Sequence, residues 1–229
     1  MNKRGLSHIE MIVSFVLFVS FLSFAIFFFN PFQNRGVINT ALDYAADEIQ
    51  ESSLVELEQY SILIKSELAF VSIPSPSNIP QVGVMAEDSE GNTLASGLLG
   101  NNIAFENTPD HFVNVKLSKD FSKRNLDGEL LAQDNYTISS SDIRNVYSEK
   151  KFISLNDSYY SDYENLRENF SLPSSIDFGF SVVFNNQGDE ISTSKEIPDN
   201  VEVYSKRKRI EIVRENGGIA FADLIVRVW

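Results

Sequence analysis

One uncharged segment near the start of the chain most constrains what this sequence can fold into. Residues Met11–Phe29 form a run of 19 residues without a charge, whose only polar members are three serines. As a helix, this run is about 28 Å long, close to the ~30 Å thickness of a bilayer's hydrocarbon core. It is longer than the apolar region of an ordinary secretion signal, and no small-residue cleavage site follows it. Pro31 cannot continue the helix. The sequence therefore predicts a transmembrane helix.

The charges on the two sides of this span predict its orientation. Lys3 and Arg4 precede it, whereas the first basic residue after it, Arg35, is soon followed by several acidic residues. By the positive-inside rule, the N-terminus is cytoplasmic and the remainder of the chain is extracytoplasmic. From Asn30 onward, the chain has 17 basic and 31 acidic residues, a net charge of −14. We therefore expect a single-pass membrane protein with an acidic domain at the cell surface.

Glu10 is the unusual residue of this anchor. A carboxylate drawn to the middle of a bilayer costs up to about 2.5–3.5 kcal/mol, so a partner for it is expected. A basic pair at Lys3 and Arg4, then Gly5, then Glu10 five residues later and an unbroken apolar helix resemble the class III signal of type IV pilins and pseudopilins. The leader is very short, as in archaeal members of that family. The resemblance covers residues 1–29.

The resemblance implies how the chain is processed and assembled. In that family, a prepilin peptidase removes the basic leader, which here places the cut between Gly5 and Leu6. Glu10 becomes the fifth mature residue and pairs with the N-terminal amine of a neighbouring subunit, which neutralises both charges in apolar surroundings. The implied function is that of a major or minor structural subunit of a type IV pilus-like surface filament. Its implied partners are the membrane, prepilin peptidase, further copies of the chain and other pilin-like subunits.

The spacing of polar residues in the helix favours packing between helices. Ser7, Glu10, Ser14 and Leu17 are three, four and three residues apart, so they share one helix face. Small and polar residues on one face let membrane helices approach each other, and we expect these four residues to carry assembly. The alternative is a monomeric, single-pass, membrane-anchored extracellular binding module in which Glu10 is incidental. Replacing Glu10 by alanine would stop assembly in the first case and change nothing in the second.

The rest of the chain predicts an α+β fold. Apolar residues spaced three and four apart after a short joint at Asn34–Gly36 predict an amphipathic helix from residue 37 to about residue 51. A turn-rich, strand-rich segment follows, which we expect to form a mainly antiparallel, sandwich-like β domain, as one unit or as two small lobes. No cysteine is present, so disulfides cannot stabilise it. The expected divisions are 1–5 leader, 6–29 transmembrane helix, 30–53 joint and amphipathic helix, and 54–229 extracytoplasmic domain.

Local patterns predict the elements of the β domain. Alternating apolar residues predict strands at 54–65, 82–86, 93–99, 103–106, 112–117, 143–153, 176–184, 201–204, 210–214 and 219–229. Glycine- and asparagine-rich turns are expected at 88–92, 185–189 and 215–218. The prolines in residues 73–80 predict a loop. Residues 119–142 are polar, and their irregular pattern predicts no regular element. Apolar residues at helical spacing predict a short helix at 159–170.

No motif predicts catalysis. The sequence has no Gly-x-Ser-x-Gly elbow, no phosphate-binding glycine loop and no cluster with metal-ligand spacing. We therefore expect a structural protein that is not an enzyme and has no cofactor, metal or small-molecule substrate. Two acidic turns, at Asp88–Asn92 and Asn185–Glu190, contain calcium-type oxygen ligands but lack the spacing of an EF-hand. We interpret both as hairpin turns.

One basic run interrupts the acidic domain, at Lys206, Arg207, Lys208 and Arg209. It could contact an acidic face of another subunit or a polyanion, although no specific nucleic acid is predicted. A strand edge kept charged to prevent pairing between sheets explains the run at least as well, and we favour that interpretation. Three asparagines match the N-glycosylation pattern: Asn135, Asn156 and Asn169.

Overall fold

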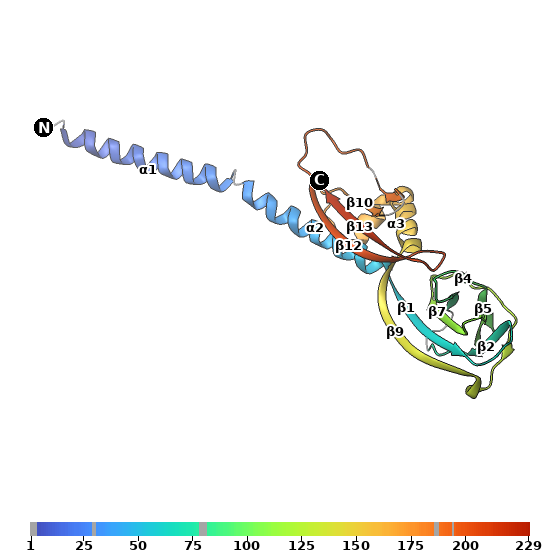
Figure 1. The fold of residues 1–229 in the computed structure, drawn as a ribbon. Coiled ribbons are helices and arrows are strands. Elements are labelled where there is room, and N and C mark those ends of the chain that lie inside the picture. Colours follow the sequence, from blue (N-terminus) through green and yellow to red (C-terminus); the bar gives the residue numbers. More distant parts are fainter. Residues whose placement is uncertain (1–3, 29–30, 78–81, 186–187, 194) are drawn as a thin grey trace.

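The computed structural model describes residues 4–28, 31–77, 82–185, 188–193 and 195–229. Two helices form a rod that extends from a β-rich body (Figure 1). Helix α1 spans Arg4–Phe28 and helix α2 spans Pro31–Ser53. Pro31 suits the first position of α2, because a backbone N–H at this position would have no partner within the helix. The fixed φ of proline is also a helical value. The fold is α+β, as predicted.

Helix α2 buries an apolar face against the body. Its buried residues recur at helical spacing: Ala41, Leu42, Ala45, Ala46 and Ile49. They pack mainly with strands β12 (Tyr204–Val213) and β13 (Ile219–Val228) and with helix α3 (Glu149–Ser161). The predicted amphipathic helix is therefore confirmed.

The predicted joint at Asn34–Gly36 is wrong, because these residues lie inside α2. A glycine within a helix lowers the stability of the helix by only about 1 kcal/mol relative to alanine. The burial of the later turns of α2 against the body outweighs this loss.

The described residues form two sheets. The larger sheet has nine strands in the order β11-β10-β13-β12-β9-β1-β7-β3-β4, and the smaller has four in the order β5-β6-β2-β8. The larger sheet is antiparallel except where β9 and β12 meet, and the smaller is antiparallel except between β2 and β8. The remaining bounds are β1 Leu54–Ile64, β2 Phe70–Pro74, β3 Gly83–Glu87, β4 Thr93–Leu94, β5 Ser96–Leu99, β6 Asn102–Glu106, β7 Phe112–Ser118, β8 Glu129–Leu130, β9 Tyr136–Ser148, β10 Phe178–Phe184 and β11 Glu190–Ser192.

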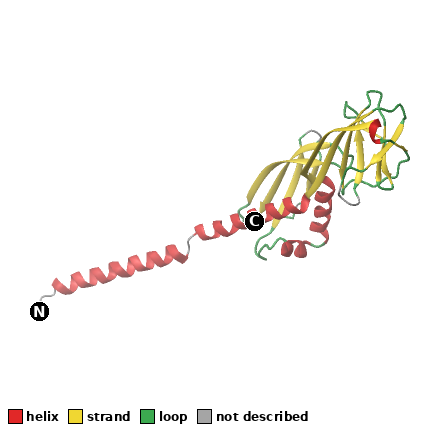
Figure 2. Ribbon diagram, turned by 90° about the horizontal axis from the view of Figure 1, so that it is seen from below, coloured by secondary structure: helices red, strands yellow, loops and turns green. Residues whose placement is uncertain are grey.

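Separate cores divide the body into two lobes. In the proximal lobe, helices α2, α3 and α4 (Tyr163–Asn169) pack with β10, β12 and β13 around residues such as Phe152 and Phe180 (Figure 2). The distal lobe is the continuous stretch of residues 58–143. There the smaller sheet faces β1, β3 and β7 across a core that includes Ile62 and Phe105. The distal lobe has the sandwich-like arrangement that we predicted, whereas helices cover the sheet in the proximal lobe.

Strands β1 and β9 join the lobes. They pair from Leu54 opposite Tyr147 to Ile64 opposite Tyr136. Strand β7 pairs with β1 from Glu58 onward, and β12 pairs with β9 only at Tyr147 and Ser148. Between these points the described sheet is two strands wide. We call this stretch the waist, and it consists of the pairs Val55–Val146, Glu56–Asn145 and Leu57–Arg144.

Several predicted elements around β9 are wrong. Residues 119–142, predicted to be irregular, include β8 and the first half of β9, whose exposed Ser139–Ser141 segment shows no apolar alternation. The strand predicted at 143–153 ends at Ser148, because its side chain accepts a hydrogen bond from the Lys151 N–H at 3.2 Å and caps α3. The single helix predicted at 159–170 is two helices, α3 and α4, separated at Asp162.

Other differences concern where strands begin and end. The strands predicted at 201–204 and 210–214 are one strand, β12, which begins at Tyr204 and contains the whole basic run. The strand predicted at 93–99 divides at Ala95, because β4 pairs with β3 while β5 pairs with β6 in the other sheet. The first two residues of the loop predicted at 73–80 end β2, and residues 78–81 lie outside the described residues. The turns at 88–92 and 215–218 are where we predicted them, and Gly188 has a φ of 68° as expected for its turn.

Buried tyrosines predict a loss of stability in alkali. Burial is the main cause that raises the pKa of Tyr60 and Tyr159 from 10.0 to about 12, and it also raises the pKa of Tyr163. A group whose folded pKa lies above its unfolded pKa contributes stability that is complete below the unfolded value. We therefore expect the free energy of unfolding to fall between pH 10 and pH 12.

This prediction is checked by urea unfolding at a series of pH values, with tyrosinate absorbance recorded in parallel. Tyr159→Phe removes one of the shifted groups, together with the hydrogen bond that Tyr159 donates to the Phe178 carbonyl at 2.8 Å. Below pH 10, the variant should have a lower free energy of unfolding than the parent protein. Between pH 10 and pH 12, its free energy of unfolding should fall by less than that of the parent. Full ionisation of all tyrosines near pH 10 in the folded protein would contradict the prediction.

Candidate functional site: the exposed anchor helix

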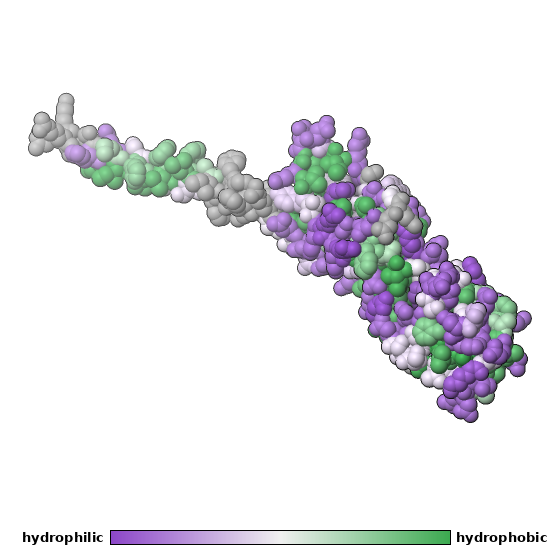
Figure 3. Space-filling view, viewed as in Figure 1, coloured by the Kyte–Doolittle hydropathy of each residue, from purple (hydrophilic) through white to green (hydrophobic). Residues whose placement is uncertain are grey.

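Helix α1 is apolar and exposed. The segment His8–Ala25 has a mean hydropathy of 1.9, and none of it is buried in the described structure. Large side chains such as Met11 and Phe21 are 72% and 68% exposed. In Figure 3, α1 extends as a hydrophobic rod away from a largely hydrophilic body. By length and composition, α1 could span a membrane. A helix that is hydrophobic all round requires lipid or protein around it.

The helix places the predicted assembly residues on one stripe. The 3.6-residue period puts positions 7, 10, 14 and 17 on the same side of α1, and Glu10, Ser14 and Leu17 are exposed. Gly5 and Leu6, between which the cut is predicted, lie in the first turn of α1 just after Arg4. Lys3 lies outside the described residues. Glu10 therefore lies nearly two turns from the N-terminal end of an exposed apolar helix.

Helix α2, the next helix after the anchor, packs on the proximal lobe. Ala45 and Ile49 are fully buried against the body. Asp43 forms an ion pair with Lys206 of β12 at 2.7 Å, and Gln50 accepts a hydrogen bond from the Tyr147 hydroxyl at 3.2 Å. α1 and the distal lobe therefore lie at opposite ends of the molecule (Figure 1).

A shallow apolar groove lies where the rod meets the body. It has a volume of about 290 Å³, and Val37 and Tyr44 of α2, each 57% exposed, form one side of it. The other side is the segment Ser171–Pro173, in which Ser171 has a φ of 53°. Sequence patterns did not reveal this groove, because the two sides are more than a hundred residues apart in the chain and the turn at Ser171 has no glycine to signal it.

Each residue of the basic run has a partner within the chain. Lys206 forms an ion pair with Asp43, and Lys208 donates hydrogen bonds to Gln50 and to the Tyr147 hydroxyl. Arg207 forms an ion pair with Asp223 at 2.6 Å. The Arg209 guanidinium lies 5.0 Å from the centre of the Phe221 ring. The hydrogen bond to Asp43 raises the pKa of Lys206. The run lies along the part of β12 that precedes its contact with β9. This placement fits a charged strand edge, while contact with a subunit or polyanion stays a prediction.

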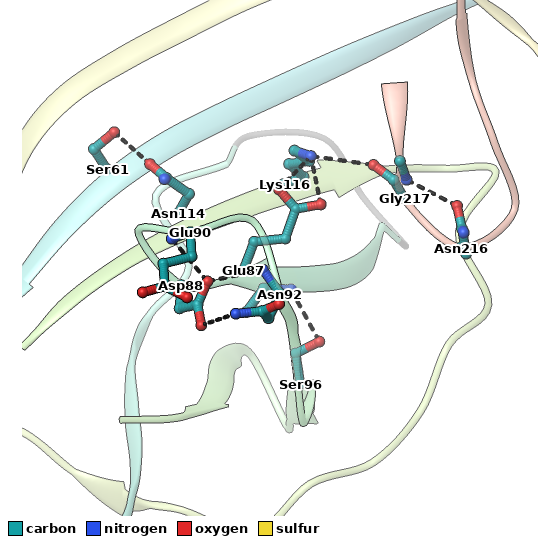
Figure 4. Close-up of polar contacts among 12 residues, drawn as sticks. Ser61, Glu87, Asp88, Glu90, Asn92, Ser96, Asn114, Lys116, Asn216 and Gly217 are labelled. Atoms are coloured by element: carbon teal, nitrogen blue, oxygen red, sulfur yellow. Dashed lines mark hydrogen bonds and ion pairs between the residues drawn. The ribbon is translucent and has the colours of Figure 1, made fainter. Parts of the chain in front are cut away.

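The acidic turn at Asp88–Asn92 is held by hydrogen bonds within itself. The Asp88 carboxylate accepts the N–H of Glu90 at 2.9 Å, and the N–H and side-chain amide of Asn92 at 2.8 Å each (Figure 4). The bonds from Asn92 lower the pKa of Asp88 most. Residues 186 and 187 of the second acidic turn lie outside the described residues. Among the residues that are described, no three His, Asp or Glu side chains are placed to hold a metal ion together.

The three N-glycosylation matches have different surroundings. Asn135 is exposed at the end of a 3₁₀ turn, and Asn169 is exposed at the end of α4. Asn156 is half-buried within α3, and its side-chain oxygen is inaccessible to solvent. Asn135 and Asn169 are therefore the more accessible acceptors.

No protein-family model, curated protein or solved structure matches this chain. The features that bear on function are therefore those of the chain's own residues. These are the N-terminal residues up to Glu10, the exposed helix α1, and helix α2, which packs on the proximal lobe.

Proposed function

We propose that the chain is a structural subunit, major or minor, of a type IV pilus-like surface filament. A prepilin peptidase cuts between Gly5 and Leu6, and α1 then bundles with α1 of neighbouring subunits while the two lobes decorate the outside. The N-terminus is cytoplasmic before assembly, and the lobes are extracytoplasmic. The observation that carries the proposal is Glu10, five residues after Gly5, at the start of an apolar helix that is exposed over His8–Ala25.

The arrangement of the chain supports this proposal in two ways. Glu10, Ser14 and Leu17 face one side of α1, so one helix can approach another along a stripe of polar and small residues. Helix α2 follows the anchor in the chain and packs on the proximal sheet, so the lobes are attached to the anchor through a helix that belongs to their own core. A charged Glu10 in an apolar bundle requires a cation, and the new amine at Leu6 provides one on each neighbouring copy.

The mature N-terminus tests the first step. We expect mass spectrometry of the membrane fraction to find a chain that begins at Leu6. Gly5→Val, which places a branched side chain at the cut, should leave the leader attached, whereas the same change at Gly36 in α2 should leave processing unchanged. A chain that keeps its leader in the unmodified protein would contradict processing and leave a plain signal anchor.

A further inference from the structure

The waist is where the larger sheet is reduced to two strands. Along Val55–Leu57 and Arg144–Val146, the described sheet consists of β1 and β9 alone. Two-stranded ribbons twist more than wide sheets, and they are marginally stable without other contacts. The chain passes between the lobes in these two strands, since the distal lobe is the continuous stretch 58–143. The orientation of the lobes therefore depends on contacts made beside the waist.

A small apolar cluster and two polar contacts lie beside it. The cluster combines waist residues with side chains of both lobes: Val55, Leu57, Val146, Phe121, Val213, Met85 and Ile219. One polar contact is the ion pair between Arg144 of the waist and Glu211 of β12, at 3.0 Å. The other is made by Lys116 of β7, whose Nζ lies 2.7 Å from both carboxylate oxygens of Glu87 and donates to the Gly217 carbonyl at 3.2 Å (Figure 4). The Lys116 and Glu87 side chains are 7% and 18% exposed. Gly217 belongs to the proximal lobe, so this bond crosses between the lobes.

Gly217 allows the proximal hairpin to reach the distal lobe. It lies in the turn between β12 and β13, where its N–H donates to the Arg214 carbonyl at 2.9 Å. Its φ is +81°, and a Cβ at this position would lie 2.9 Å from Cγ of Met85. A side chain here would therefore require the Met85 side chain or the hairpin to shift. Both the positive φ of the turn and the close contact with Met85 favour glycine here.

Opening this contact leaves no unpaired charge. Lys116 and Glu87 both belong to the distal lobe, on neighbouring strands β7 and β3, and Lys116 lies opposite Met85 in that pairing. If the hairpin moves away, the ion pair stays intact and Lys116 loses only its bond to the Gly217 carbonyl. Because breaking a buried ion pair is strongly unfavourable, a contact that keeps the pair together can open at much lower cost.

We infer that the contact between the β12–β13 hairpin and the Lys116–Glu87 pair is a latch that fixes the orientation of the distal lobe. When the latch opens, the distal lobe turns about the waist while both lobes keep their own cores. The latch sets how the outermost part of the protein is presented relative to the anchor. This inference does not rest on filament assembly, since it concerns the two lobes of one chain.

The absence of cysteine allows the inference to be tested by spin labelling of the full chain in detergent. One label is placed at Ile153→Cys in α3 and one at Leu130→Cys in β8, positions that are 40% and 58% exposed in the two lobes. Gly217→Asn tests the latch, because asparagine tolerates a positive φ but its side chain would meet Met85. Gly91→Asn is the matched control, since Gly91 has a φ of +86° with nothing within 4 Å of an added Cβ.

In the parent and in Gly91→Asn, we expect a single narrow distribution of distances between the two spin labels. In Gly217→Asn, we expect a second population of label-to-label distances. Hydrogen exchange should show unchanged protection of β7 and β10, which report on the two cores. The double variant Lys116→Met/Glu87→Leu removes the bond to Gly217 without leaving a charge unpaired, and it should show the same second population. If Gly217→Asn does not fold, this double variant alone shows whether the contact fixes the orientation of the distal lobe. A single unchanged population in the folded variants, or a second population accompanied by loss of protection in β7, would overturn the inference.

Discussion

Replacement of Glu10 by alanine is expected to abolish filament assembly while the cut after Gly5 and the insertion of α1 continue. In the proposed filament, Glu10 neutralises the N-terminal amine of a neighbouring subunit in apolar surroundings. Removing one member of a buried ion pair costs about 3–5 kcal/mol because the other charge is left unpaired. Since 1.4 kcal/mol is a factor of ten, each contact weakens by roughly a hundredfold or more. The measurement is the amount of filament sheared from the cell surface, with electron microscopy of the same fraction.

Two further variants make this experiment specific. Glu51→Ala removes an exposed carboxylate from the end of α2 and should assemble normally. Glu10→Gln keeps the size and hydrogen-bonding groups of the side chain without the charge, and it should fail to assemble if neutralisation is the reason. Normal assembly of Glu10→Ala would exclude the proposed role of Glu10. If processing is absent as well, a monomeric, membrane-anchored binding module becomes the better explanation.

Phe178→Ala is expected to cause the largest loss of stability of any single change considered. Phe178 is fully buried, and its ring packs against Tyr159, Tyr163 and Phe170 with centroid distances of 5.6, 5.5 and 5.2 Å. Truncating a buried phenylalanine costs about 3–5 kcal/mol, from lost burial and from the cavity that remains. The cavity would lie where α3, α4 and β10 meet. Urea unfolding followed by circular dichroism measures the change.

Phe221→Ala is the matched control for this substitution. Phe221 lies in β13 beside the buried Ala222, but its own side chain is outside the proximal core and is 54% exposed. Its loss removes little buried area and one contact with Arg209, so we expect a change of about 1 kcal/mol or less. Equal losses in Phe178→Ala and Phe221→Ala would show that the proximal core does not depend on the aromatic cluster.

The elements that were predictable from the sequence have strong local signals. The 19-residue apolar run predicted α1, and the spacing of Ala41, Ala45 and Ile49 predicted the buried face of α2. The alternation of β1 and the glycines of the 215–218 turn likewise predicted a strand and a hairpin where the structure has them. At the candidate site, residue spacing alone places Glu10, Ser14 and Leu17 on one face, because helix geometry fixes it.

The features that were not predictable depend on contacts between distant residues. Strand β9 forms because it pairs with β1, so its exposed serines show no local alternation. The groove beside Tyr44 and the latch at Gly217 each join segments about a hundred or more residues apart. The sequence marked Gly217 as a turn residue. Its contact with Met85 follows only from the tertiary arrangement.

The route of the chain through the distal lobe also makes this lobe exchangeable. It begins after Leu57 and ends before Arg144, and these two residues are paired neighbours on β1 and β9. A segment whose two ends lie side by side can be replaced by another fold with the same spacing, as in natural domain insertions. The rod needs no change to accept it, whereas the β12–β13 hairpin of the proximal lobe would need a new contact in place of Met85 and Lys116. The outermost surface is therefore free to diverge, or to be grafted, independently of the helix that anchors it.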